Sequence, residues 1–365
     1  MISRDDSLII DYGKAIGIIL VVMYHLKTNF FNVYHAYMFH MPLFFFIGGM
    51  LFKKSPVLRT IIKSTKKQFV YLLYTFVILA LVGTIITKLF GIGTGNVYTG
   101  KLINSVILAF ESNLSNNKLF IVAWFLLAYW LVSILFSVAY KSLQVFKNEK
   151  NKNFVIIVMG VILGYTAVNV FAENYHTYKS IPLLILSQVS FGMMFYSAGF
   201  VLKNKFLQHL NIYTFIIITG VLFILRNYGL ATSTVMSWAG YRDGFYVSSF
   251  TAFSGIYAVF LISKLIASQG ELKILKEIGK SSRAIMSYHV LCFVVLDILF
   301  SYVLSYKTSG TDAYMNHFYD KWTWPVYVAF GVIIPTSFSY LYRLIKNRTV
   351  MFRTPSRSTS YADKI

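Results

Sequence analysis

Besides Lys27 at its end, three acidic, basic or imidazole side chains lie within one apolar stretch of the sequence, residues 8–27, which reads LIIDYGKAIGIILVVMYHLK. They are Asp11, Lys14 and His25. An ionisable group inside a membrane segment is costly, so its presence is by default a functional hypothesis. At about 100° per residue, Lys14 lies about 60° and His25 about 40° around the helix axis from Asp11. The spacing therefore predicts a polar seam on one helix face, with His25 about 21 Å along the axis from Asp11.

Each part of this seam has a catalytic and a structural explanation. Asp11 and Lys14 are three residues apart, and the structural alternative is that they only neutralise each other at the edge of the membrane. His25 is a candidate general base, because an imidazole titrates near neutral pH. The structural alternative for His25 is a buried neutral histidine that bonds a backbone carbonyl.

A second histidine, His40, opens the next apolar segment with the tripeptide His40-Met41-Pro42. The link from the first segment is short, so we expect the two imidazoles at a similar depth, with His40 as a hydrogen-bond partner of His25 or as an oxyanion donor. Asp11 is too far along the helix to orient His25 directly, and we expect it to act through Lys14. Two histidines without an HExxH motif or a nearby acidic residue do not predict a metal site.

The loop over residues 53–67 is strongly basic. Arg59, Lys63 and Lys67 follow one another at intervals of one helical turn, which predicts a cationic stripe. Such a stripe suits a phosphorylated cytoplasmic cosubstrate. The alternative is that these charges only set the topology and bind anionic lipid.

A later polar segment, residues 279–289, reads GKSSRAIMSYH. Ser281 or Ser282 is predicted to cap a helix that begins near residue 283. His289 would then lie one to two turns into the membrane, at the depth of Asp11 and Lys14 and not at that of His25.

The composition is that of a membrane protein. The chain is 57% hydrophobic and 13% charged, whereas a soluble domain carries about 25% charged residues. Apolar runs long enough to cross a bilayer recur along the chain. The predicted spans are 8–27, 36–52, 69–90, 119–140, 154–172, 181–202, 211–229, 246–267, 283–305 and 323–345.

The basic residues lie between these spans and are unevenly divided. Twenty-four Lys and Arg fall on one side and eight on the other, which predicts that both the N and C termini are cytoplasmic. This distribution accounts for the net charge of +21 without nucleic acid as a partner. The sequence therefore predicts an all-α integral membrane protein of about ten transmembrane helices. It forms one transmembrane domain over residues 1–346, in contact with membrane lipid, followed by a flexible basic cytoplasmic tail over residues 347–365.

These motifs together resemble the acyltransferase-3 family of membrane O-acyltransferases, and more closely its fucose 4-O-acetylase-like branch. The family's first helix carries Asp, a basic residue and His at the positions of Asp11, Lys14 and His25, and FHMPLFF recurs at residues 39–45. The WFL at residues 124–126 and the segment 279–289 resemble two further family motifs. The chain departs from the family where Lys14 replaces an arginine, and where lysines and Tyr71 replace an arginine pair on the third helix.

The resemblance implies an enzyme that transfers an acyl group, chiefly acetyl from acetyl-CoA as cosubstrate, to a hydroxyl of a cell-surface polysaccharide or lipid-linked glycan. It implies a multi-pass protein of the bacterial cytoplasmic membrane, and it adds His289 and Ser282 to the expected donor site. The alternative is a transporter or exporter of a glycan or small solute, with the buried charges along its path.

Overall fold

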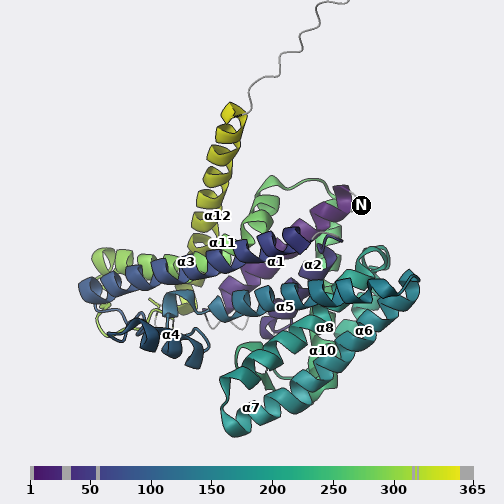
Figure 1. Cartoon of the computed structure of the whole chain (residues 1–365). Coiled ribbons are helices and arrows are strands. Elements are labelled where there is room, and N and C mark those ends of the chain that lie inside the picture. The colour runs from purple at the N-terminus through teal and green to yellow at the C-terminus, as the bar shows by residue number, and fades with distance from the viewer. Residues whose placement is uncertain (1–3, 27–33, 55–57, 315–316, 319, 354–365) are drawn as a thin grey trace, which may run out of the picture.

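The computed structural model describes residues 4–26, 34–54, 58–314, 317–318 and 320–353, and the described part is almost entirely helical (Figure 1). The helices are α1 (Arg4–Tyr24), α2 (His40–Met50), α3 (Leu58–Phe90), α4 (Leu102–Glu111), α5 (Ala123–Ser142), α6 (Glu149–Thr166), α7 (Glu173–Tyr178), α8 (Ile181–Gln208), α9 (Ile212–Asn227), α10 (Gly244–Ser268), α11 (Lys273–Val303) and α12 (Asp320–Arg353). A two-stranded antiparallel hairpin, β1 (Thr234–Val235) and β2 (Gly240–Tyr241), lies between α9 and α10.

Eight of the described helices are long and apolar enough to cross a membrane. They fall on eight of the ten predicted spans, and the shorter apolar helices α2 and α9 fall on the other two. The all-α membrane fold is thus confirmed, while the count of ten crossings stays a prediction. Two further differences concern α4, which the sequence did not predict, and α12, which continues to Arg353 into the predicted tail.

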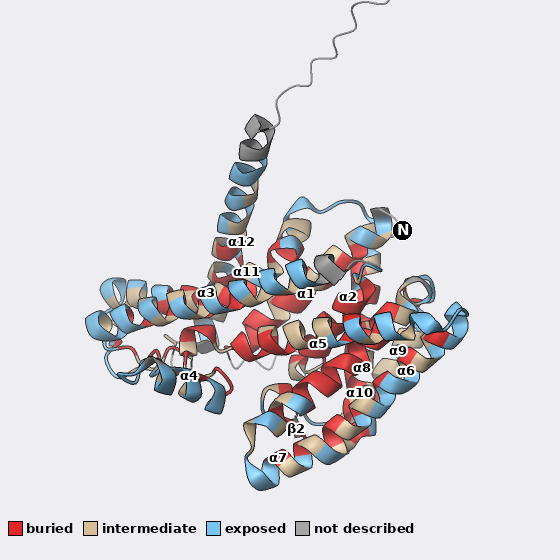
Figure 2. Cartoon of the chain, in the orientation of Figure 1, coloured by how far each residue is buried: buried red, intermediate tan, exposed pale blue. Residues whose placement is uncertain are grey.

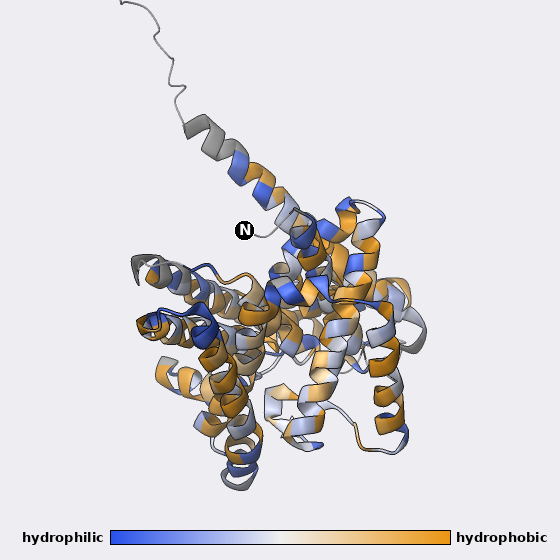
Figure 3. Ribbon diagram, turned by 90° about the vertical axis from the view of Figure 1, so that its right-hand side faces the viewer, coloured by the Kyte–Doolittle hydropathy of each residue, from blue (hydrophilic) through white to orange (hydrophobic). Residues whose placement is uncertain are grey.

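The surface of the bundle is apolar where lipid would contact it. Hydrophobic residues colour most of the helical ribbon, and hydrophilic residues gather at helix ends and loops (Figure 3). On α3 the side chains of Val70, Leu73, Val77, Leu81, Ile85 and Leu89 recur at helical spacing and are all exposed. Because no aqueous protein would leave such a stripe uncovered, this face fits a bilayer.

The short helix α2 forms the centre of the bundle, and all eleven of its residues are buried (Figure 2). Because Gly49 and Gly199 have no side chains, the backbones of α2 and α8 pack in direct contact. A Cβ added at Gly49 would lie 1.9 Å from the Tyr196 carbonyl oxygen, and one at Gly199 would lie 2.0 Å from that of Phe46. The small residues therefore fix α2 in the core, and with it the position of His40 at its first turn.

The helices α1 and α11 pack along each other and set the depth of the polar residues. Near the N-terminal end of α11, a Cβ added at Gly279 would lie 2.0 Å from the Asp11 carbonyl oxygen, so the two backbones touch there. From this crossing, His289 is ten residues along α11 and His25 is fourteen residues along the first segment, advances of about 15 and 21 Å. The two histidines consequently lie at a similar depth.

Candidate active site

Two histidine rings meet at the centre of the protein. His25 follows the last residue of α1, and its ring centroid lies 4.8 Å from that of His289 on α11. His289 is fully buried and is the seventeenth of the thirty-one residues of α11. The predicted depth of His289 was therefore wrong. The cause is the start of the helix: α11 begins at Lys273, so Ser281 and Ser282 lie inside it and do not cap it.

The tautomer of His289 follows from its hydrogen bonds. Its Nδ1 lies 2.9 Å from the Ile285 carbonyl oxygen and 3.0 Å from that of Met286. A carbonyl oxygen only accepts, so Nδ1 carries a proton and donates it. In the neutral ring, Nε2 is then unprotonated and carries a lone pair. It has no hydrogen-bond partner among the described residues. Within the same part of the chain, the buried Nδ1 of His25 also has none.

His40 lies close to this pair without bonding to it. Its Nδ1 donates to the Ala36 carbonyl oxygen at 2.5 Å, and its ring packs edge-on against Tyr37 with centroids 5.1 Å apart. Among the described contacts of His25, the neighbouring histidine ring is that of His289 and not that of His40. Because Nδ1 of His40 donates to Ala36, Nε2 of the neutral ring carries a lone pair and no proton. Nε2 could therefore donate to an oxyanion only if the ring were protonated.

Beside the histidines, aromatic rings gather at the C-terminal end of α1. Tyr314 packs edge-on against His25 at 5.3 Å, and Tyr24, His35 and Tyr37 form a connected group with centroids 4.7–5.9 Å apart. Burial, and to a smaller extent the nearby Arg226 charge, together lower the pKa of His35 to about 4. The His35 ring is therefore neutral at pH 7, and the group combines flat apolar ring faces with polar edges.

A cavity of about 280 Å³ opens at the opposite end of the seam. Its polar lining includes Lys14, Gln68, Tyr71, Ser282 and Arg283. The Arg283 guanidinium lies over the Tyr71 ring, 4.3 Å from its centroid, and the Tyr71 hydroxyl is 2.9 Å from the Ser287 hydroxyl. The cavity thus combines two cationic side chains with hydrogen-bonding groups.

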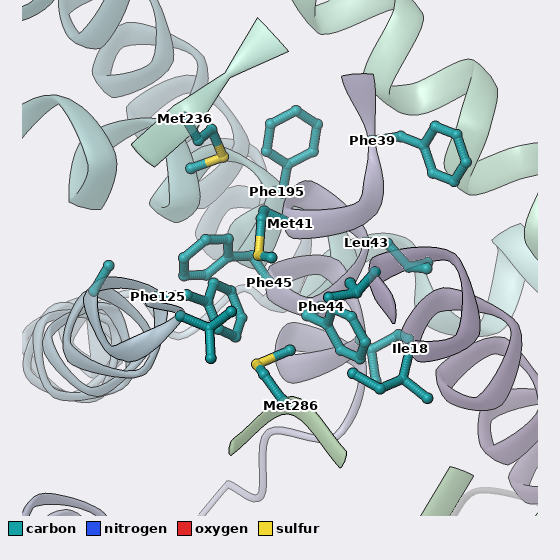
Figure 4. Packing of buried hydrophobic residues seen from close by; sticks show 14 of the residues in the cluster. Ile18, Phe39, Met41, Leu43, Phe44, Phe45, Phe125, Phe195, Met236 and Met286 are labelled. Atoms are coloured by element: carbon teal, nitrogen blue, oxygen red, sulfur yellow. The ribbon is translucent and has the colours of Figure 1, made fainter. Parts of the chain in front are cut away.

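Much of the lining of this cavity is apolar. Phe44, Phe125 and Met286 line it, and their side chains converge in Figure 4. Met286 also supplies one of the carbonyls that hold His289 Nδ1. Met286 therefore both lines the cavity and positions the His289 ring.

The predicted donor residues are only partly brought together. Lys14 and Ser282 line the cavity, and Lys14 also pairs with Asp11 at 2.6 Å, as the spacing predicted. Lys63 and Lys67 are exposed on the first turns of α3 and are not among the cavity-lining residues, while the side chain of Arg59 lies outside those the structure describes. Sequence reasoning missed Arg283, although it stands directly after Ser282 in the segment that was singled out.

Asp297 has partners that the sequence did not reveal. One carboxylate oxygen accepts a hydrogen bond from His317 Nδ1 at 2.8 Å, and the other accepts from the Tyr327 hydroxyl and from the Phe318 backbone N–H. All three side chains are buried, and the His317 ring packs against Phe293, which in turn packs against His289. This cluster ties the segment before α12 to α11 next to the histidine pair.

No group of three or more His, Cys, Asp or Glu side chains is arranged to hold a metal ion within the described parts of the chain.

The fold and the buried histidine pair define an integral-membrane protein whose polar chemistry lies inside a helical bundle. Residues 8–344 match the family model described as an acyltransferase domain, and the chain belongs to this family, acyltransferase-3. Neither a curated protein nor a solved structure matches the chain. The family makes this protein a membrane acyltransferase.

Proposed function

We propose that this protein is an O-acyltransferase that moves an acyl group, chiefly acetyl, from cytoplasmic acyl-CoA to a hydroxyl of a cell-surface polysaccharide or lipid-linked glycan. The observation that carries the proposal is the order of groups along α1 and α11. A cavity with two cationic side chains lies at one end. At the other lie two histidines, each with a buried ring nitrogen that has no hydrogen-bond partner among the described residues. The protein then belongs to the bacterial cytoplasmic membrane, with the cavity facing the cytoplasm.

The cavity suits an acyl-CoA. Lys14 and Arg283 offer charge to the donor's phosphates or polar arm, and the apolar wall of Phe44, Phe125 and Met286 accepts the acyl end. His289 lies six residues beyond Arg283 on α11, an advance of about 9 Å. An extended arm held at Arg283 can thus carry its thioester toward the histidines.

His25 is the base in this proposal. It takes the proton from the acceptor hydroxyl as the hydroxyl oxygen bonds to the acyl carbon, and it later returns that proton to the thiolate of the departing CoA. No net proton is consumed. The aromatic group around Tyr37 and Tyr314 supplies a surface for the acceptor sugar beside His25. No specific contact among the described residues favours the transporter alternative.

The test uses inside-out membrane vesicles that contain the protein, because their exposed face is the cytoplasmic one. Vesicles from the same host without the protein are the control. Acetyl-labelled acetyl-CoA should transfer label to saccharide in the vesicles, and mild alkali should release that label because the bond is an ester. If saccharide labelling is the same in both preparations, the proposal fails.

The topology can be checked by cysteine labelling in a Cys292→Ser background, because Cys292 is the sole cysteine and is buried. Single cysteines at the exposed positions Tyr98 and Ser309 should react with an impermeant maleimide added to intact cells. Cysteines at the exposed positions Lys150 and Gln269 should react only after the membrane is opened. The reverse pattern would overturn the orientation with both termini in the cytoplasm.

Donor binding should depend on Arg283. Replacing it with glutamine removes the charge while keeping a polar side chain of similar length, and the KM for acetyl-CoA should rise about tenfold, the equivalent of one charge-assisted hydrogen bond. The triple change Arg59→Gln, Lys63→Gln, Lys67→Gln should also raise KM, and raised salt should mimic it because the charges of Lys63 and Lys67 are exposed. Initial rates against acetyl-CoA concentration at two salt concentrations separate the two effects. An unchanged KM in both variants would place the donor elsewhere.

A further inference from the structure

We infer that His289 is the nucleophile of a two-step transfer and carries the acyl group on its Nε2 between donor and acceptor. The inference rests on the proposed function and adds to it a covalent intermediate and a separate role for each histidine. The observation behind it is the unequal bonding of the two rings.

The ring of His289 is held in its nucleophilic form by its own helix. Its Nδ1–H is bonded to the carbonyls of Ile285 and Met286, one turn back along α11, so the proton cannot move to Nε2 without breaking these bonds. Nε2 is buried, and the described residues provide it with no hydrogen-bond donor. A buried acceptor without a partner is rare in a folded protein and needs a functional explanation.

Position assigns the donor side to His289 and the acceptor side to His25. His289 follows Met286 of the cavity wall by three residues, about 4.5 Å along α11. His25 lies eleven residues beyond Lys14, about 16 Å along the first segment, and its ring contacts Tyr314 of the aromatic group. The donor therefore meets His289 first, whereas the acceptor meets His25.

The two steps balance in atoms and charge. In the first, His289 Nε2 bonds to the acyl carbon and the carbon–sulfur bond breaks, which gives an acylimidazolium and the CoA thiolate. In the second, the acceptor oxygen bonds to the acyl carbon, its proton passes to His25, and the bond to Nε2 breaks. His25 then gives its proton to the CoA thiolate or to water, and both rings return to neutral.

Such a relay explains how a charged donor and a bulky acceptor react without meeting. The phosphates of CoA would stay at the cytoplasmic mouth near Arg283, because carrying them through the apolar wall is costly. Only the acyl group crosses the gap between the rings, whose centroids are 4.8 Å apart.

The test is isotope exchange without an acceptor. Purified full-length protein in lipid nanodiscs is mixed with acetyl-CoA and radiolabelled free CoA, and label appearing in acetyl-CoA is measured. A covalent intermediate allows this exchange, whereas direct transfer does not. Wild-type protein should exchange label, and the His25→Gln variant should still exchange while losing transfer to saccharide in vesicles.

His289→Asn is the decisive variant. Its side-chain amide can still donate to the Ile285 and Met286 carbonyls, so the local structure is kept while Nε2 is removed. Exchange should fall at least a hundredfold with the elution profile and melting temperature unchanged. If this variant exchanges like wild type, or if wild type acylates saccharide without any exchange, the inference is overturned and the proposed function stands. If wild type neither exchanges nor acylates saccharide, the proposed function itself fails.

Discussion

Replacing His25 with alanine should lower acyl transfer by about 10²–10⁴-fold, the contribution of a positioned general base, while the protein stays folded in the membrane. The fold should tolerate the change because His25 lies just beyond α1 and its buried Nδ1 bonds to no described residue. The measurement is the rate of label transfer in inside-out vesicles, normalised to the amount of monodisperse protein extracted from them.

Two neighbouring variants serve as comparisons for His25→Ala. His40→Ala should lower transfer at least about tenfold, because His40 lies beside the pair and orders Tyr37 through their ring contact. Asp11→Asn should act on donor affinity, since Asp11 bonds Lys14 at the cavity and lies about 21 Å from His25 along the axis. If His25→Ala turns over like wild type, or if its activity falls only in proportion to folded protein, His25 is structural.

The sequence was sufficient for features that depend on local spacing. Apolar runs gave the helices because bilayer thickness fixes their length. Asp11 and Lys14 are paired because residues three apart on a helix are neighbours whatever surrounds them.

Features that depend on where two distant helices touch could not be predicted in this way. The depth of His289 depends on the crossing of Gly279 with the backbone of Asp11, a contact between residues far apart in sequence. The start of α11 was also placed ten residues too late, because the charged stretch before Gly279 reads as a separate surface segment. Both errors moved His289 toward the cytoplasm, away from His25.

Arg283 was missed for a related reason. A basic residue at the cytoplasmic end of a span is ordinary, and the counts used for topology already accounted for it. Its role becomes visible only when Tyr71 of α3 lies under its guanidinium and both line the cavity with Lys14. Three segments, none adjacent in sequence, must be assembled before the cluster exists.

Replacing Asp297 with alanine should destabilise the protein by about 3–5 kcal/mol, the cost of removing one partner from a buried charged or strongly polar pair. The carboxylate accepts hydrogen bonds from His317, Tyr327 and the Phe318 N–H. Its removal would take this acceptor from the buried His317 and Tyr327 side chains, while the Phe318 N–H would keep the Tyr327 hydroxyl as an acceptor. In a helix that the bilayer surrounds, little water is available to replace it. The measurement is the melting temperature of purified protein in detergent, together with the yield of monodisperse protein.

Tyr327→Phe is the matched comparison, because it removes one hydroxyl from the same cluster and keeps the ring and the carboxylate. It should cost about 1–3 kcal/mol, because it removes the hydrogen bond that the hydroxyl donates to Asp297 and the one that it accepts from the Phe318 N–H. The cluster also anchors the segment that carries Tyr314, whose ring contacts His25. Asp297→Asn keeps an acceptor oxygen. It should therefore lower turnover while leaving the melting temperature close to that of wild type. If Asp297→Ala melts like wild type, the carboxylate does not hold the segment, and the packing of α11 against α12 must position Tyr314 instead.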